Sequence, residues 1–353
     1  MPQSHILKSY NLYQNALAFG RISMTKVIEV ENLTKIYKGN IKAVDDISFD
    51  VNEGALFGFL GPNGAGKTTT IKLLTTLASI TSGKATVLGH DVSKQPNMVR
   101  KSIGIVPQDL TIDNELKGNE NIMLAAKLYH VPNHVAKKRV EDLLELVGLT
   151  DAANRLVSTY SGGMRKRLEL IVGLVHEPKV LFMDEPTLGL DVNTRKIIWD
   201  YIRELNKEKR VTIFMTTHYL EEADAICDVA AIIDRGKIRA QGSPQELKEI
   251  IGGEVITIEL NKERDLQNFF SSIKGVKEVK KLGSTYGIKL GTAEDAIPAI
   301  IEGIYARGVK IKALSCSKPS LDQVFLEVTG KEFREEESAE AASRRQNIIA
   351  RRG

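Results

Sequence analysis

Two short glycine-rich stretches, about a hundred residues apart, have the composition of phosphate-binding loops. The first reads Gly-Pro-Asn-Gly-Ala-Gly-Lys-Thr over residues 61–68, and the second reads Tyr-Ser-Gly-Gly-Met over residues 160–164. Glycines let backbone N–H groups converge on phosphate oxygens, and a helix that starts directly afterwards turns its positive dipole end toward them. Because one loop is enough to hold a nucleotide, two loops indicate that each copy of the chain completes the site of another copy.

The first loop lies between an apolar, strand-like run over residues 55–60 and a helical run over residues 67–77, as a nucleotide-binding loop requires. Lys67 is expected to reach the β and γ phosphates and to assist catalysis, and the Thr68 hydroxyl to ligate Mg²⁺. The loop predicts nucleotide contacts from Gly61, Pro62, Asn63, Gly64, Ala65, Gly66, Lys67, Thr68 and Thr69.

Two carboxylates, Asp184 and Glu185, end an apolar run over residues 180–183. Charges at the tip of a buried strand are costly unless something cationic or reactive lies beside them. We expect Asp184 to coordinate Mg²⁺ and Glu185 to polarise the water that attacks the γ-phosphate. An isolated Asp-Glu pair usually caps a helix or lies in a solvated turn, but downstream of a phosphate loop the catalytic interpretation is favoured.

Two further polar residues follow apolar runs in the same way. His218 ends the run over residues 211–217 and could bind the γ-phosphate or hold the attacking water in line. Gln108 follows the run over residues 102–106 and could contact Mg²⁺ or water, although an exposed glutamine is the default interpretation.

Strand-like and helical runs alternate from residue 26, which predicts an α/β fold with a largely parallel sheet. Apolar residues at helical spacing indicate a helical insert over about residues 110–176. Residues 254–315 follow the order βαββαβ, the ferredoxin-like pattern. We expect residues 1–25 to form an N-terminal extension and the charged residues 331–353 a tail.

The composition argues against several classes of protein. A net charge of +4 with no interleaved aromatics gives no reason to expect nucleic acid as a partner. No apolar run approaches the roughly 18 residues of a membrane span. The two cysteines, Cys227 and Cys316, form no zinc or disulfide pattern.

The motifs from Tyr37 to His218 resemble those of the ATP-binding subunits of ABC transporters. Ser161, Gly162 and Gly163 match the signature of that family, which opens a helix and binds the γ-phosphate of ATP held by the partner subunit. The resemblance implies a homodimer, ATP and Mg²⁺ as ligands, and an ATPase. It also implies a P-loop (RecA-like) ABC ATPase core over residues 26–250, with an antiparallel β part and the helical insert, followed by a small α+β ferredoxin-like domain over residues 251–330.

The family's remaining roles fall on single residues. Tyr37 matches the aromatic that stacks on adenine, Gln108 the loop that senses nucleotide and faces the membrane subunit, and Asp191 the loop that communicates across the dimer. Met164 departs from the commoner glutamine at the end of the signature, which puts coupling in question more than ATP binding.

Residues 160–165 and 320–327 resemble the drug-resistance type of these ATPases, similar to daunorubicin exporters. This implies a separate ABC-2 type transmembrane subunit, peripheral association with the cytoplasmic face of the cell membrane, and export of a drug-like, lipid or other hydrophobic substrate. A GTPase is set aside because Asn206-Lys-Glu-Lys209 lacks the final aspartate of the base-reading motif. The alternatives left open are a soluble ABC ATPase acting on the ribosome or DNA, and a ligand-sensing role for the C-terminal domain.

Overall fold

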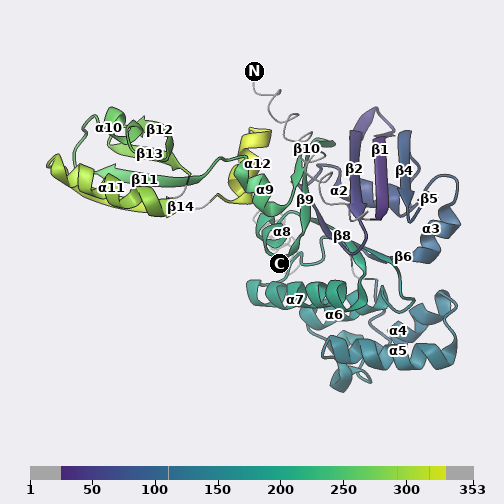
Figure 1. Cartoon of the computed structure of the whole chain (residues 1–353). Helices are drawn as coiled ribbons and strands as arrows, with labels where there is room; N and C mark the ends of the chain where they lie inside the picture. The colour runs from purple at the N-terminus through teal and green to yellow at the C-terminus, as the bar shows by residue number, and fades with distance from the viewer. Residues whose placement is uncertain (1–24, 110, 292, 318, 331–353) are drawn as a thin grey trace, which may run out of the picture.

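Three β-sheets and the helices around them make up the part of the chain that the computed structural model describes, which is residues 25–109, 111–291, 293–317 and 319–330 (Figure 1). The expected N-terminal extension, apart from Thr25, and the expected charged tail lie outside these residues.

The central sheet has six strands in the order β10-β9-β3-β8-β7-β6. Five are parallel and β10 pairs antiparallel with β9 at one edge. The strands are β3 (Leu56–Leu60), β6 (Ile103–Val106), β7 (Val180–Asp184), β8 (Thr212–Thr217), β9 (Val229–Asp234) and β10 (Lys237–Gly242). Every residue of β3, β7 and β8 is buried, which explains their apolar sequences. Because β8 lies between β3 and β7, the carboxyl ends of these three strands meet at one place.

An antiparallel sheet packs beside the central one, in the order β2-β1-β4-β5. Its strands are β1 (Lys26–Tyr37), β2 (Ile41–Asn52), β4 (Ser82–Val87) and β5 (His90–Asp91). Apolar and polar residues alternate along β2, and Ile47, Phe49 and Val51 are buried. The Phe49 ring stacks on Phe57 of β3 at 5.6 Å between centroids, so aromatic side chains join the two sheets.

Helices flank the sheets and form the predicted insert, which contains no named strand over the described residues 111–176. The helix after the first loop ends at Leu74, three residues before the predicted end. The helices of this part are α2 (Lys67–Leu74), α3 (Pro96–Ser102), α4 (Gly118–Leu128), α5 (Asn133–Leu146), α6 (Gly162–Val172), α7 (Val192–Lys209) and α8 (Leu220–Ile226), with short 3-10 turns at Thr150–Ala152 and Val157–Thr159.

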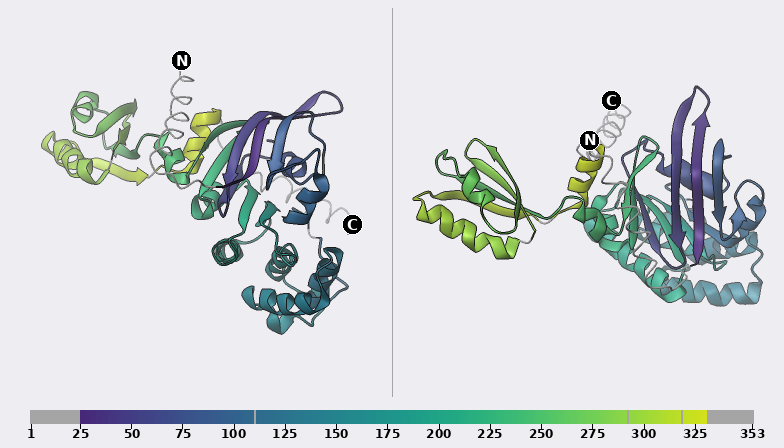
Figure 2. Two further views of the ribbon diagram at one scale, coloured as in Figure 1. Left: turned by 45° about the vertical axis from the view of Figure 1, so that its right-hand side comes forward. Right: turned by 45° about the horizontal axis from the view of Figure 1, so that its top comes forward.

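The third sheet has four antiparallel strands in the order β12-β13-β11-β14, which is the ferredoxin-like arrangement predicted from the sequence. It has a core of its own around Ile256, Phe270 and Tyr286, and it stands apart from the other sheets in each view of Figures 1 and 2. Its elements are β11 (Glu254–Leu260), α10 (Gln267–Ser271), β12 (Val276–Leu282), β13 (Thr285–Leu290), α11 (Ala293–Ala306) and β14 (Ile311–Ser317).

The last described helix, α12 (Leu321–Thr329), does not pack with this third sheet, although the sequence analysis placed it in the same accessory domain. It contacts α8 and α9 (Pro244–Glu249) instead. Leu321, Val324 and Phe325 belong to the hydrophobic core of the central sheet. Their spacing forms one apolar stripe on the helix, and burying that stripe brings the chain back to the first unit.

We predict that Phe325→Ala destabilises the unit built on the central sheet by about 3–5 kcal/mol, the usual cost of emptying a buried phenylalanine site. Trp199, the only tryptophan, lies in α7, so its fluorescence during urea unfolding reports that unit alone. Leu326→Ala is the matched control because Leu326 is 43% exposed. An unchanged Trp199 transition in Phe325→Ala would contradict the packing of α12.

Candidate functional site

The three glycines of the first loop are required for different reasons. A Cβ added at Gly61 would lie 2.2 Å from the Ile233 carbonyl oxygen, and one at Gly66 would lie 2.4 Å from the Ala43 carbonyl oxygen. Only Gly64, with φ +77, has no neighbour within 4 Å on that side. The sequence analysis gave all three the same role in phosphate approach, whereas Gly61 and Gly66 are also needed for the loop to pack against the adjoining backbone.

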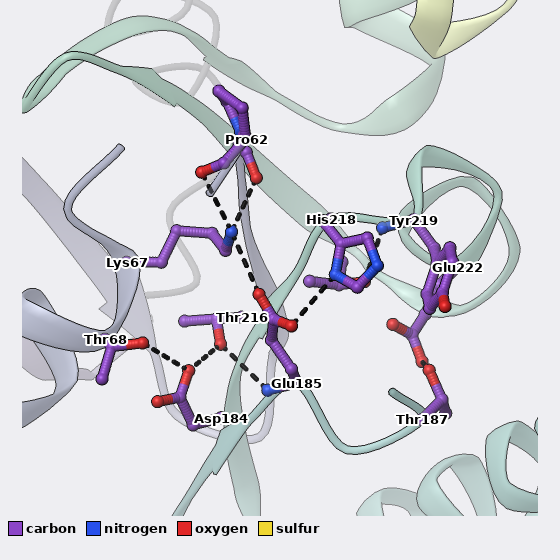
Figure 3. Close-up of polar contacts among 12 residues, drawn as sticks. Pro62, Lys67, Thr68, Asp184, Glu185, Thr187, Thr216, His218, Tyr219 and Glu222 are labelled. Atoms are coloured by element: carbon purple, nitrogen blue, oxygen red, sulfur yellow. Dashed lines mark hydrogen bonds and ion pairs between the residues drawn. The ribbon is translucent and has the colours of Figure 1, made fainter. Parts of the chain in front are cut away.

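Lys67 begins α2, and its ammonium group lies within the loop (Figure 3). It donates hydrogen bonds to the carbonyl oxygens of Gly61 at 2.7 Å and Pro62 at 3.2 Å. It also forms an ion pair with Glu185 Oε1 at 3.1 Å, and both side chains are buried. The structure therefore joins the first predicted catalytic residue to the carboxylate that ends β7.

Asp184 and Thr68, both predicted to hold Mg²⁺, meet at the carboxyl edge of the sheet. The hydroxyls of Thr68 and Thr216 donate to Asp184 Oδ1 at 3.3 and 2.5 Å (Figure 3). Among the described residues no group of three or more His, Cys, Asp or Glu could hold a metal without other ligands. One carboxylate and one hydroxyl fit Mg²⁺, which usually takes only one or two protein carboxylates together with water and substrate phosphates.

Glu185 adopts a left-handed backbone conformation, with φ +49, that is uncommon outside glycine. Its backbone N–H donates to Thr216 Oγ1 at 3.1 Å, which holds the turn against β8. Burial acts to raise the pKa of Glu185, but the hydrogen bond with His218 and the charge of Lys67 outweigh it, so the pKa lies below its ordinary value. The side chain is accordingly an ionised carboxylate at neutral pH.

His218 completes this cluster from the end of β8. Its Nδ1 lies 3.0 Å from Glu185 Oε2. Because an ionised carboxylate only accepts hydrogen bonds, the imidazole donates through Nδ1. The three predicted catalytic residues, Lys67, Glu185 and His218, thus form one buried chain of contacts.

Two other predicted residues, Tyr37 and Gln108, are not part of that chain. Tyr37 is 40% exposed, with Lys35 Nζ 5.1 Å from its ring centroid. Gln108 is exposed, and over the described residues no hydrogen bond joins it to Asp184 or Thr68. The segment that carries Gln108 is anchored nearby, since the Thr111 N–H donates to Glu169 Oε1 of α6 at 2.9 Å.

The second loop caps α6. Ser161 Oγ accepts a hydrogen bond from the Met164 N–H at 3.3 Å. A Cβ at Gly162 would meet nothing within 4 Å, whereas one at Gly163 would lie 2.8 Å from Thr194. These three residues and Asp191 line a surface cleft of about 620 Å³. In the described residues no hydrogen bond or ion pair joins this loop to the first one.

Asp191 caps α7 in a similar way. Its carboxylate accepts hydrogen bonds from the backbone N–H groups of Asn193 and Thr194, each at 3.1 Å, and from the Thr194 hydroxyl at 2.6 Å. The Thr194 hydroxyl, followed by these N–H groups, holds the pKa of Asp191 below its usual range.

Sequence reasoning missed four side chains that surround the catalytic chain. Thr216 joins Asp184 to the backbone of Glu185. Glu222, on α8, accepts hydrogen bonds from the Thr187 hydroxyl and the Trp199 indole N–H. Of these four side chains, only Thr216 has a signal in the sequence, because two threonines directly precede His218. The contacts of Thr187, Trp199 and Glu222 depend on how α7 and α8 pack.

Comparison with known proteins agrees with this geometry. The family model for ABC transporters matches residues 44–188, and the model described as ATP-binding protein DrrA1-3-like, C-terminal domain, matches residues 242–329. A daunorubicin/doxorubicin resistance ATP-binding protein of Streptomyces peucetius is 37% identical, over 90% of this chain and 97% of that protein. A linearmycin resistance ATP-binding protein of Bacillus subtilis is 35% identical, over 88% of this chain and the whole of that protein.

Solved structures share the fold. The CbiO1 subunit of an ABC transporter complex from Clostridium perfringens has a TM-score of 0.60 at 29% identity, covering 64% of this chain and 93% of its own. A dimeric ATP-binding cassette in a post-hydrolysis state, bound to ADP and Pi, has a TM-score of 0.55 at 23% identity, covering 61% of this chain and 98% of its own.

No helix in the described part of the chain is both long enough and apolar enough to cross a membrane. Family membership follows from the near full-length relatives and from the phosphate loop, signature and carboxylate pair described above. The chain belongs to the ATP-binding, ATP-hydrolysing subunits of ABC transporters, in the group whose C-terminal domain is of the DrrA type.

Proposed function

We propose that Glu185 is the residue that activates water for ATP hydrolysis, with Lys67 and His218 as its partners. The observation that carries this proposal is the buried chain of contacts from Lys67 through Glu185 to His218 at the carboxyl edge of the sheet. An ionised carboxylate in that position can accept a proton from water. The imidazole of His218 orients the carboxylate through Nδ1, which leaves Nε2 for the γ-phosphate or the water.

Lys67 has a second role in this scheme. Its ammonium contacts two loop carbonyls and Glu185 Oε1, so a triphosphate in the loop competes for the same cation. When Lys67 turns to the phosphates, Glu185 Oε1 becomes available to the attacking water. Thr68 and Asp184 would hold Mg²⁺, which supplies positive charge that offsets the charge developing on the phosphoryl oxygens.

The second loop acts on the nucleotide of a partner copy in this proposal. A Cβ at Gly162 would meet nothing within 4 Å, and this glycine begins α6, whose positive dipole end suits a phosphate brought by another molecule. ABC ATPase domains work as dimers with a membrane subunit. We therefore place two ATP molecules between two copies, with Tyr37 against adenine, Gln108 at the Mg²⁺ and membrane-facing side, and Asp191 at the dimer interface.

We further propose that the membrane subunit is of the ABC-2 type and that the pair exports a drug-like, lipid or other hydrophobic substrate from the cytoplasmic face of the cell membrane. The drug-resistance names of the relatives support this. Within the chain, residues 26–250 would be the nucleotide-binding domain and residues 251–330 an accessory domain whose last helix returns to the first. No observation favours an action on the ribosome or DNA.

We predict that Glu185→Gln binds ATP but loses nearly all hydrolysis and accumulates as an ATP-bound dimer, because the shape of the side chain is kept while its basicity is lost. Size-exclusion chromatography with Mg-ATP and a phosphate-release assay measure both effects. Lys67→Met is the matched comparison and should bind ATP weakly and remain monomeric. A monomeric Glu185→Gln variant that hydrolyses ATP at the wild-type rate would disprove the assignment.

In the Glu185→Gln background, adding Ser161→Arg should abolish the ATP-dependent dimer and leave ATP binding by the monomer unchanged. The long cationic side chain occupies the face that the partner nucleotide needs, and the first loop is untouched. Equilibrium binding of a fluorescent ATP analogue and light scattering separate the two properties. Ser93→Arg, on an exposed loop, controls for the added charge. Retention of the dimer would refute the shared site.

The depressed pKa of Glu185 also predicts how stability depends on pH. The folded state binds its proton less readily than the unfolded state, so the ionised carboxylate stabilises the protein above the ordinary pKa of about 4.3, and this contribution is lost as the pH falls through the folded pKa. Glu185→Gln should therefore be less stable than wild type at pH 7, and the difference should narrow on acidification. Urea unfolding monitored by Trp199 fluorescence from pH 7 to about pH 2, below the ordinary carboxyl pKa, tests this, and a difference that widens would be inconsistent with it.

A further inference from the structure

Glu222 is a fully buried carboxyl group on α8, one helical turn after His218. Burial raises its pKa, although the hydroxyls of Thr217 and Thr187 and the indole of Trp199 act in the opposite direction. Burying a carboxyl group costs free energy of folding, which indicates that Glu222 has a role beyond packing. Nothing in the roles proposed above uses this side chain.

The contacts of Glu222 connect three separate parts of the fold. Its Oε1 accepts hydrogen bonds from Thr187 Oγ1 at 2.9 Å and from Trp199 Nε1 at 2.8 Å. Thr187 belongs to the turn that begins at Glu185, where the Leu188 N–H donates to the Glu185 carbonyl at 3.2 Å. Trp199 lies two turns into α7, the helix that Asp191 caps.

These contacts close a ring around the catalytic pair (Figure 3). Two hydrogen bonds form the ring: one joins Thr187 to Glu222, and the other joins His218 to Glu185. Two backbone segments complete it, one from Glu185 to Thr187 and one from His218 to Glu222. A closed ring of two short backbone segments and two hydrogen bonds leaves little freedom in the distance between His218 and the Glu185 carboxylate. Trp199 fixes the ring to α7 at the same oxygen.

We propose that Glu222 is a positioning residue that holds Glu185 and His218 in their reactive arrangement by tying the turn after β7 to the first turn of α8. In this role it acts through that pair rather than on the nucleotide itself. The inference rests on the roles proposed above for Glu185 and His218. Small displacements of catalytic groups lower the rate of the chemical step far more than they affect substrate binding.

The decisive variant is Thr187→Val, which keeps the volume of the side chain and removes only its hydrogen bond to Glu222. We expect kcat for ATP hydrolysis to fall about tenfold or more with the KM for ATP nearly unchanged. Thr187→Ser should restore kcat because it restores the donor. Glu222→Gln should also keep most of kcat, since the amide oxygen can accept both hydrogen bonds, while Glu222→Leu should lose it. Glu221→Ala, the exposed neighbour on the same helix, is the matched control.

A double-mutant comparison identifies the group through which Glu222 acts. In a His218→Ala background, Thr187→Val should cause little further loss, because the pair to be positioned is already broken. Each variant is first checked for a wild-type Trp199 unfolding transition. A folded Thr187→Val protein with wild-type kcat, or a full additional loss in the His218→Ala background, would overturn the positioning role. Wild-type kcat in His218→Ala itself would instead remove the role assigned to His218, so the two failures are distinguishable.

Discussion

The Glu185 carboxylate, held between the Lys67 ammonium and the His218 imidazole, is the interaction on which the rest of the site depends. An ionised carboxylate in a buried place is tolerated only when cations and hydrogen-bond donors surround it. Its partners come from the first turn of α2 and from the end of β8. The Glu185 carboxylate can therefore be buried only because β8 lies between β3 and β7. The apolar strands and the aromatic contacts between the sheets stabilise that strand order.

The same charge explains why the surrounding polar groups occur where they do. Thr216 satisfies both Asp184 and the backbone of Glu185, which lets two adjacent acids end one strand without leaving an unpaired donor. The left-handed conformation of Glu185 turns the chain so that consecutive carboxylates point to different partners: Asp184 toward Thr68, and Glu185 toward Lys67 and His218. The metal and water chemistry proposed above would thereby fall on neighbouring residues.

Much of this could be predicted from the sequence, because local patterns carry it. The order βαββαβ over residues 254–315 is confirmed, since apolar runs there end at glycine or polar turns. Lys67 could be named because it follows the glycine loop, and Glu185 and His218 because each lies at the end of an apolar run. The contacts of Thr216 and Glu222 could not be predicted, since they depend on which strands and helices become neighbours. The packing of the helix from Leu321 to Thr329 could not be predicted for the same reason: its apolar stripe shows that it packs, but not against what.

The return of α12 to the central sheet makes the third sheet an insertion between α9 and α12 rather than an appendage. An inserted unit is connected at both ends, here to α9 and to α12. The two helices that anchor it are packed against the helix that follows His218. Both ends of the inserted sheet therefore lead to helices that contact each other, and α12 also contacts α8, so the third sheet is joined to the core through the neighbours of the candidate site.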